Sequence, residues 1–489
     1  MAYHPSKTSA KTLTYVIPRN WGDPSFDPLD SDSVANAAHM EQLVGTLVKM
    51  GASGKYEPYL AESWDQSEDA LFWRFRLREN LSCSDGSPID APSFVTSFQT
   101  TLALYAASTE VPVFSQLRGW DAFLKGDLEA LGIRAIGEKE IIFEFARKPQ
   151  AGLLQYLSMP YYGFYCTGNF QDGKWKDRDS IISSGAYVLE KVEEDKTIVL
   201  RKRQSDRIRK DAPEIVKIRR LEKAEALALK SEKTIVHTIL TGEEEIPDHW
   251  MRLTGVPINL IGIAFGRQEA GPFKEVHARR YILQRLRDLL PKDPVGSYSP
   301  ARSFYFDALA KPEAAGRRIE TPKVSFDGVV KILSGAKHGR GKVVGLIEEM
   351  LGSVLSDLGL KYEFFGLDPN DPNFVKRYTS NDEWHIRLFN VSTGSSPKNW
   401  VVRMMFCSSL GINFTDPSGR ICELVDRFDR APFDYVDYVK EFEAIIEEDA
   451  AVIPLFHMRQ TWLYTDDLDL SRVSLTIDIP PFENVGVRE

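Results

Sequence analysis

Short stretches in which apolar and charged residues alternate mark the strands of the N-terminal half. Residues 72–77 (FWRFRL) alternate with period two, which predicts a strand with one buried face. Residues 133–146 and 184–203 predict two hairpins, the first turning at Gly137. Residues 12–21 predict the first strand. Up to about residue 240 the chain is therefore predicted to be rich in strands.

Other stretches have the spacing of helices. Residues 34–50 carry apolar residues at helical intervals and predict one helix. Residues 90–105 predict another, with Asp90 as the N-cap and Pro92 in the first turn. Residues 435–448 predict a third, which is followed by the apolar run AVIPLF.

Strands and helices alternate in the C-terminal half. The pattern predicts a strand, helix, strand, helix and strand at 329–334, 342–359, 361–367, near 372–378, and at 384–391. Strands that are separated by helices favour right-handed crossovers and a largely parallel sheet. This half is predicted to be an α/β unit.

Length and charge narrow the class of protein. A chain of 489 residues predicts two or three packed units. Its formal net charge of −9 argues against a nucleic-acid surface, which needs clustered Lys and Arg. No window reaches the roughly 20 apolar residues of a membrane helix. The first twelve residues have no apolar h-region, which suits a mature exported protein or a cytoplasmic one.

The four cysteines lack the spacing of a metal site. Cys83, Cys166, Cys407 and Cys422 form no CxxC pair and no Cys/His ligand pattern. In an oxidising compartment they allow three disulfide connectivities, and buried free thiols are an equal alternative. A zinc site is not expected.

Motifs for chemistry are absent or incomplete. Residues 335–343 (GAKHGRGKV) lack the spacing and the Ser or Thr of a phosphate loop, and no GxSxG elbow occurs. His457 follows a buried strand and is interpreted as a packed histidine. His237 and His249 flank an acidic run that is interpreted as a surface loop. We expect neither an enzyme nor a bound cofactor or metal.

Aromatic and amide side chains gather in predicted loops instead. The segments 159–170 and 390–406, together with Trp250, combine apolar rings with a few polar groups. Such a mixture is typical of a binding cleft, and an ordinary core edge is the alternative for any single residue.

Four segments, in order along nearly the whole chain, resemble the family 5 extracellular solute-binding proteins, which include the dipeptide- and oligopeptide-binding proteins of ABC importers. Residues 55–98 are similar to the family signature, in which LAESW precedes a hairpin, a DG turn and a helix. The segments SSGAYVLEKV, GPFKEVHARRYILQRLRDLL and FEAIIEEDAAVIPLFH resemble three further family segments. In that family the segment that corresponds to residues 55–98 is part of the structural scaffold.

The resemblance implies a two-lobe α/β fold of the periplasmic-binding-protein type (type II, cluster C). Lobe I would comprise residues 1–262 and 460–489, with about 45–160 as an extra subdomain, and lobe II residues 263–459. The implied function is that of the solute-binding protein of an ABC importer, which closes on a peptide or another small polar solute. The implied partner is the membrane permease, and the protein would be a monomer at the outer face of the membrane, periplasmic or extracellular, without nucleic acid.

One segment departs from the family pattern. Peptide binders of the family carry an Asp that pairs with the peptide ammonium. Aligning the final proline of that segment with Pro397 places Asn390 at its Trp and Thr393 at its Asp. A buried ammonium beside the neutral Thr393 would lack its counter-charge, at a cost of several kcal/mol. A neutral or anionic polar ligand is therefore favoured, such as a saccharide, an opine-like conjugate or a blocked peptide. The candidate ligand-binding residues are Asn390, Thr393, Ser395, Asn399, Trp400, Arg403, Tyr161, Tyr162 and Trp250.

Two other functions remain open. A ligand-sensing regulatory domain of the same fold would explain the lack of a signal sequence, but no helix-turn-helix segment is found at either end of the chain. A hydrolase is disfavoured because no nucleophile motif is present.

Overall fold

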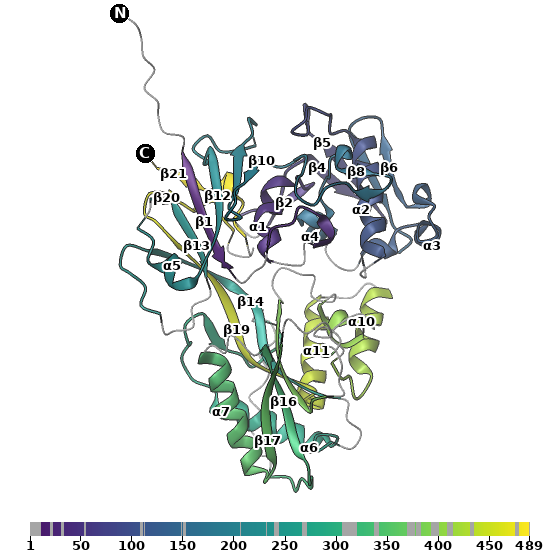
Figure 1. Cartoon of the computed structure of the whole chain (residues 1–489). Coiled ribbons are helices and arrows are strands. Elements are labelled where there is room, and N and C mark those ends of the chain that lie inside the picture. The colour runs from purple at the N-terminus through teal and green to yellow at the C-terminus, as the bar shows by residue number, and fades with distance from the viewer. Residues whose placement is uncertain are drawn as a thin grey trace, which may run out of the picture. The chain divides into compact units, whose positions relative to one another are not determined.

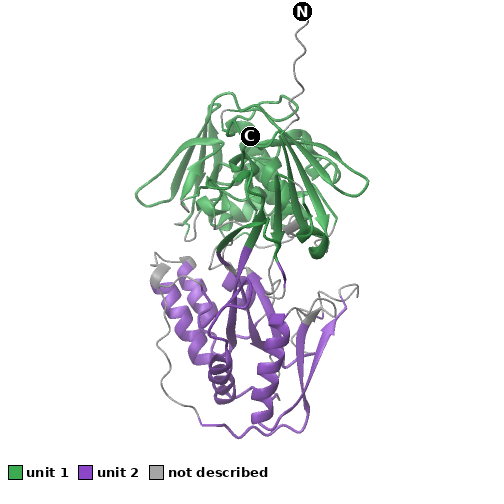
Figure 2. Ribbon diagram, turned by 90° about the vertical axis from the view of Figure 1, so that its left-hand side faces the viewer, with its two compact units in different colours: residues 1–238, 246–255, 461–489 green, residues 239–245, 256–460 purple. Residues whose placement is uncertain are grey.

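The computed structural model divides the described chain into two compact units (Figures 1 and 2). Unit 1 comprises residues 1–238, 246–255 and 461–489, and unit 2 comprises residues 239–245 and 256–460. The predicted boundaries of the two lobes, residues 1–262 with 460–489 for lobe I and 263–459 for lobe II, stay a prediction. The structure describes residues 11–19, 23–30, 34–52, 55–107, 111, 113–147, 149, 153–205, 207–230, 232–238, 244–266, 271–305, 320–336, 342–368, 377, 383–392, 401–407, 414–430, 435–474 and 479–488.

Unit 1 is built on one mixed sheet. Its strand order is β10 (Tyr187–Val192), β11 (Ile198–Lys202), β12 (Ile215–Leu221), β1 (Thr12–Pro18), β13 (Thr234–Thr238) and the end of β19 (Val452–Tyr464). β1 runs parallel to β12 and β13, while β10 and β11 form the predicted hairpin. Leu13, Tyr15 and Ile17 of β1 are fully buried. The predicted first strand is confirmed, and it ends at Pro18.

The predicted helix over 34–50 is wrong beyond its first ten residues. α1 spans Val34–Leu43, and β2 (Val48–Met50) follows. The Leu43 carbonyl accepts hydrogen bonds from the backbone N–H groups of Ser184 and Gly185, and the Gly45 N–H donates to the Ser184 hydroxyl. These contacts replace the next turn of the helix. They come from residues about 140 positions away, so local spacing could not reveal them.

A second, four-stranded sheet lies in unit 1, in the order β4 (Ala61–Gln66), β5 (Phe72–Leu77), β7 (Glu140–Glu144) and β6 (Ile133–Ile136). The predicted alternation in β5 is confirmed, because Phe75 and Leu77 are buried while the neighbouring arginines are exposed. The predicted hairpin at Gly137 is confirmed by the antiparallel pairing of β6 with β7. This sheet and α2 share one hydrophobic cluster.

The helix after the DG turn forms as predicted. α2 spans Ala91–Ala106 and includes Pro92 in its first turn. The Ser93 N–H donates to the Asp90 carboxylate at 2.8 Å, and the Asp90 N–H donates to the Ser93 hydroxyl at 3.0 Å. This reciprocal cap satisfies two otherwise unpaired N–H groups at the start of the helix.

Unit 1 also contains shorter elements. They are η2 (Pro28–Asp30), β3 (Tyr56–Pro58), η3 (Phe114–Gln116), α3 (Trp120–Phe123), η4 (Leu128–Ala130), α4 (Leu153–Tyr156), η5 (Pro160–Tyr162), η6 (Thr167–Asn169), β8 (Phe170–Gln171), β9 (Lys174–Trp175), α5 (Lys223–Leu227), β20 (Leu468–Asp469), η8 (Phe482–Asn484) and β21 (Gly486–Val487).

Unit 2 contains the predicted α/β arrangement. Its strands are β14 (Met251–Phe265), whose first residues up to 255 belong to unit 1, β15 (Tyr298–Pro300), β16 (Val329–Ala336), β17 (Lys361–Leu367) and β18 (Ile386–Ser392). Its helices are α6 (Val276–Leu289), α7 (Lys342–Asp357), α10 (Arg420–Arg430) and α11 (Tyr435–Asp449). β16 runs parallel to both β17 and β18, as the alternating pattern predicts. The helix predicted near 372–378 lies outside the described residues except for Arg377. The apolar run AVIPLF continues through the following residues as the single strand β19.

The cysteines form two disulfides, Cys83–Cys166 and Cys407–Cys422, which selects one of the three connectivities. The first pair joins residues 83 positions apart. Beside it, the Arg203 guanidinium donates to the carbonyls of Ser82 and Cys83 at 2.6 and 3.2 Å. The same guanidinium donates to the Gly185 carbonyl at 3.3 Å, so this junction is held by covalent and hydrogen bonds together.

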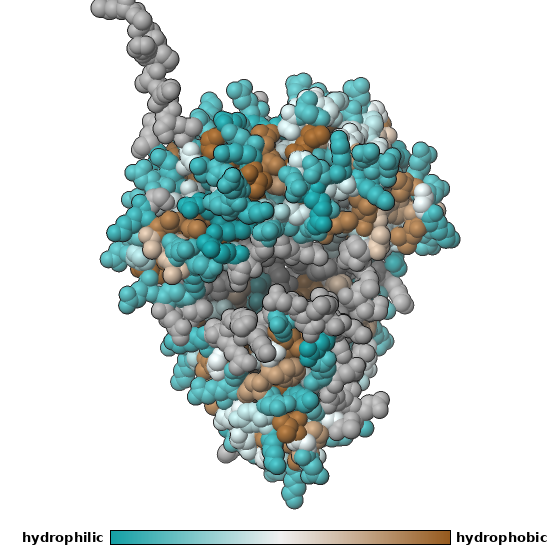
Figure 3. All heavy atoms as spheres, viewed as in Figure 1, coloured by the Kyte–Doolittle hydropathy of each residue, from teal (hydrophilic) through white to brown (hydrophobic). Residues whose placement is uncertain are grey.

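The face drawn in Figure 3 is mainly hydrophilic, with small separate apolar patches. None of the described helices is long and apolar enough to span a bilayer.

Candidate functional site

Asn390 lies on β18, the strand that leads into the predicted ligand segment of unit 2. Its side chain is exposed, and the residue pairs with Ile261 of β14. Thr393, Ser395, Asn399 and Trp400 lie outside the described residues. Arg403 starts a π-helical turn, η7 (Arg403–Cys407).

Arg403 is held by a partner that the sequence analysis missed. Its guanidinium donates to the Asp426 carboxylate on α10 at 3.1 Å, and the Arg403 side chain is 21% exposed. The two residues are 23 positions apart. Asp426 was not predicted, because local sequence around a charged residue on the polar side of a helix does not reveal a partner far away in the chain.

Aromatic rings and backbone bonds pack η7 into unit 2. Phe414 contacts both Phe389 of β18 and Phe406 of η7, with ring centroids 4.8 and 5.7 Å apart. The Phe414 N–H donates to the Met405 carbonyl at 2.5 Å. The strand and the turn on either side of the predicted ligand segment therefore belong to one hydrophobic cluster.

β18 also carries a buried cation. Arg387 has no exposed surface, and its guanidinium lies over the rings of Trp384 and Phe414 at 4.9 and 4.7 Å. Stacking of this kind offsets part of the cost of burying the charge. The run WHIRLFNV gave a signal, since it places one Arg inside an apolar strand. Arg387 is not among the residues that the sequence predicts for the site.

The two candidate tyrosines of unit 1 form part of an aromatic group. Tyr161 and Tyr162 lie in η5 and are half-buried. The Tyr162 ring lies 4.8 Å from that of Phe114 and 5.5 Å from that of Tyr156, and Tyr105 contacts both tyrosines. The segment is thus a half-exposed edge of a core, which an apolar ligand group can cover.

Trp250 is buried, with 7% of its surface exposed. Its indole N–H donates to the Leu227 carbonyl at 3.0 Å, and the ring packs in a cluster with Leu463 and Val236. The indole therefore stabilises unit 1, and a role in ligand binding stays a prediction.

The histidines that the sequence analysis singled out have structural contacts. His457 is buried, and this burial lowers its pKa to about 4, so the imidazole is neutral at pH 7. The His237 Nδ1 lies 3.0 Å from the Tyr15 hydroxyl oxygen, and the His249 Nε2 lies 2.8 Å from the Leu229 carbonyl oxygen. Among the described residues, no group of His, Cys, Asp and Glu has the arrangement of a metal site.

A buried carboxylate links α11 to the segment before residue 306. Glu443 accepts hydrogen bonds from the backbone N–H groups of Phe304 and Tyr305 at 3.1 and 2.8 Å. Burial raises the pKa of Glu443 to about 7, although these two amides and Arg287 oppose the shift. This group is therefore expected to titrate within the physiological pH range in the folded protein.

The stability of unit 2 is expected to fall between about pH 4.5 and pH 7. The folded pKa of Glu443 lies above its ordinary value of 4.5, so the native state binds more protons in this window and loses that advantage as the pH rises. The contribution of this one group is roughly 3 kcal/mol. Unfolding of unit 2 should be followed against pH in the wild type and in Glu443→Gln. Identical pH profiles would contradict the assignment, because the substitution removes only this titration.

Both the sequence and the fold are similar to those of known proteins. Residues 55–245 match the family model described as bacterial extracellular solute-binding proteins, family 5 Middle. The fold of the solved murein tripeptide-binding protein MppA of Escherichia coli is similar over 99% of each chain, with a TM-score of 0.74 at 17% identity. The chain is similar to family 5 over residues 55–245. The two-lobe α/β fold that the sequence predicts is the family 5 fold and is confirmed.

Two curated proteins are similar to this chain in sequence. The periplasmic oligopeptide-binding protein OppA of Escherichia coli is 26% identical over 179 residues, which is 34% of this chain and 31% of the relative. The probable deoxycholate-binding periplasmic protein YgiS of Escherichia coli is 26% identical over 336 residues, 64% of this chain and 59% of the relative. The chain thus spans between about a third and three fifths of these relatives in sequence.

Proposed function

We propose that the protein is the solute-binding component of an ABC importer, which binds a peptide or another small polar solute without chemical turnover. The observation that carries the proposal is the family 5 match over residues 55–245, together with the similar fold of a tripeptide-binding protein over 99% of the chain. The named relatives are binding proteins. A sensory domain or a hydrolase has no comparable support.

The proposed step is a change between an open and a closed form. A solute that contacts both lobes binds the closed form better and so shifts the population towards it. A solute that contacts one lobe alone has no such differential affinity and shifts nothing. The closed form is the one that we propose the membrane permease recognises.

The relatives named above are periplasmic proteins, and we propose a periplasmic or extracellular location for this chain, at the outer face of the membrane. The two disulfides support an oxidising compartment, because reducing systems keep cytosolic thiols free. We further propose that the protein acts as a monomer and contacts no nucleic acid, in keeping with its net charge of −9.

Two observations favour a non-peptide solute as the second candidate. Thr393 aligns with the Asp that pairs with a peptide ammonium in peptide binders of the family, so the usual counter-charge would be missing. One relative is named for deoxycholate, an amphipathic anion. Arg403 would supply a cation for such a ligand.

A thermal-shift screen distinguishes these ligand classes. Purified protein should be melted with di- to pentapeptides, oligosaccharides, opines, and deoxycholate. A solute at a hundred times its dissociation constant adds about 2.7 kcal/mol to the stability of the folded state, which raises the melting temperature. A shift with peptides supports the first candidate, and shifts with non-peptides alone support the second. If no solute gives a shift, solute binding is contradicted.

The variant Asn390→Ala tests whether Asn390 belongs to the ligand site. The side chain is exposed on β18, so truncation should leave the melting temperature without ligand unchanged and reduce the ligand-induced shift. Lys361→Ala, a change at another exposed position, on β17 of the same unit, is the matched control. Equal shifts in both variants would remove Asn390 from the candidate site.

A further inference from the structure

Two links, one helical turn apart, join η7 to α10. Arg403 pairs with Asp426 at 3.1 Å, and Cys407 is bonded to Cys422. Arg403 and Cys407 are four positions apart on η7, and Cys422 and Asp426 are four positions apart on α10. Side chains at this spacing lie on the same face of a helix, so both links join the same two faces. At the start of α10, the Cys422 N–H also donates to the carboxylate of Asp416, which precedes the helix, at 3.0 Å. Together these links fix the turn that carries Arg403.

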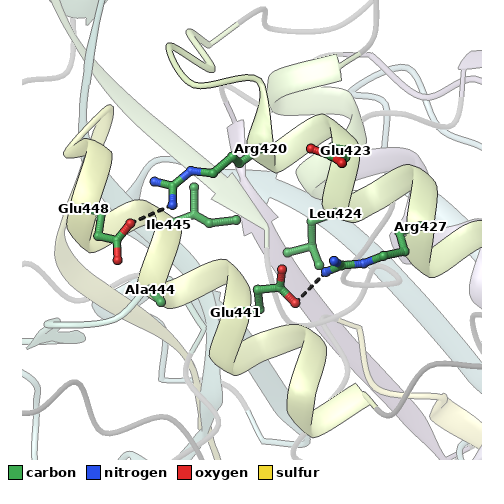
Figure 4. Close-up of a pocket in the computed structure, with 8 residues that line it drawn as sticks. All are labelled: Arg420, Glu423, Leu424, Arg427, Glu441, Ala444, Ile445 and Glu448. Atoms are coloured by element: carbon green, nitrogen blue, oxygen red, sulfur yellow. Dashed lines mark hydrogen bonds and ion pairs between the residues drawn. The ribbon is translucent and has the colours of Figure 1, made fainter.

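α10, which carries the partners of the η7 residues, is held in place by packing against α11 (Figure 4). Arg420 contacts Glu448 at 2.6 Å and Arg427 contacts Glu441 at 2.5 Å, so an ion pair lies at each end of a groove of about 320 Å³. Exposed ion pairs of this kind contribute little to stability, so the main contact between α10 and α11 is the apolar one. The buried side chains between the helices include Leu424, Ile445, Phe428 and Tyr438, and the last two have ring centroids 4.6 Å apart.

The two disulfides differ in their access to solvent. Cys83 and Cys166 are 2% and 0% exposed and lie inside the core of unit 1. Cys407 and Cys422 are only partly buried, at the border of their cluster. A thiolate must reach a sulfur atom to break a disulfide, so access decides which bond exchanges first.

We propose that the Cys407–Cys422 disulfide and the Arg403–Asp426 ion pair form a redox-sensitive clamp that positions Arg403 for solute binding. Dithiols open this clamp while the buried Cys83–Cys166 bond stays closed. The role of Arg403 in binding rests on the proposed function, whereas the opening of the clamp does not. Cys407, Cys422 and Asp426 are positioning residues, since they act through Arg403.

The chemistry of opening is a two-electron exchange. A thiolate of the dithiol attacks one sulfur atom of the disulfide, which breaks the Cys407–Cys422 bond and forms a mixed disulfide. The second thiol of the reagent then closes the reagent into its own disulfide. Cys407 and Cys422 leave as thiols with two electrons and two protons gained, and the dithiol is oxidised by the same amount.

The first experiment needs no solute. The full chain should be treated with dithiothreitol under native conditions, alkylated with iodoacetamide and analysed by mass spectrometry, and its amide hydrogen exchange should be compared before and after. We expect alkylation of Cys407 and Cys422 only, and exchange about tenfold faster in peptides that cover residues 401–407, without a change in α2. Alkylation of Cys83 or Cys166 first, or unchanged exchange at 401–407, would overturn the clamp.

Variants separate positioning from a general loss of structure. Asp426→Asn removes the charge of the ion pair while the disulfide stays, and Asp426→Glu restores the charge. Trialanine binding, measured by calorimetry, is expected to weaken at least fivefold in the reduced protein and in D426N, and to recover in D426E. Equal affinities in all four proteins would overturn the positioning role. If trialanine fails to bind the oxidised wild type, the peptide proposal fails and the exchange experiment alone decides the clamp.

Discussion

Replacing Cys83 and Cys166 by alanine is expected to lower the free energy of unfolding of unit 1 by about 4 kcal/mol. The disulfide joins residues 83 positions apart. A cross-link over such a long stretch removes much of the conformational entropy of the unfolded chain, which in the loop-closure description corresponds to about 4 to 5 kcal/mol. The Arg203 hydrogen bonds at the same junction remain in the variant, so the local fold is expected to persist.

The measurement should follow unit 1 alone, because a chain with two units need not unfold in one step. Amide exchange of α2 in increasing guanidinium reports the unfolding of that part. C407A/C422A is the matched control, since its shorter span of 15 positions lies in unit 2 and should leave α2 unaffected. A loss below about 1 kcal/mol in C83A/C166A would show that the packing around Arg203 holds the junction without the covalent bond.

Replacing Lys49 by methionine is expected to cost about 3 to 5 kcal/mol, the range for removing one partner of a buried ion pair. The Lys49 ammonium lies 2.6 Å from Glu483 and 3.2 Å from Glu41, and only 11% of its side chain is exposed. Burial alone would lower the pKa of Lys49, but Glu483, Tyr59 and Glu41 outweigh it and raise the pKa. Lys49 thus stays charged, and its loss leaves two carboxylates buried without a cation.

The double variant Lys49→Met with Glu483→Gln tests this explanation. If the cost arises from uncompensated charge, removing the charge of Glu483 should restore more than half of the lost stability, measured by denaturant unfolding at pH 7. Acid should restore stability in the single variant as well, because burial already raises the pKa of Glu41 and protonation relieves the repulsion. A double variant less stable than K49M would show that packing, and not charge, explains the loss.

Local patterns predicted the elements whose stabilising contacts are near in sequence. The alternation in β5 and the cap of α2 by Asp90 depend on residues a few positions apart, and both formed as predicted. The end of α1 depends on Ser184 and Gly185, which the spacing of residues 34–50 cannot contain. The same holds for the disulfide pairing, since four cysteines allow three solutions and only the folded chain selects one.

The same distinction between local and distant contacts applies to the candidate site. Loop aromatics and amides pointed to η5 and to the segment after β18, yet whether they bind solute stays a prediction. Arg403 was found from its position in that segment, while Asp426 was not, because the pair forms only when α10 packs against η7. Arg387 was visible as a charge within an apolar strand, and its two ring contacts required the fold.

The discontinuous course of unit 1 bears on the order in which the chain folds during synthesis. Domains generally fold as units from the N-terminus as they are made. Here the sheet and the core of unit 1 need the end of β19 and residues such as Phe482 and Glu483, which are synthesised after all of unit 2. Unit 2 is complete at residue 460, before unit 1 can close. The half of the protein that begins first is therefore expected to finish folding last.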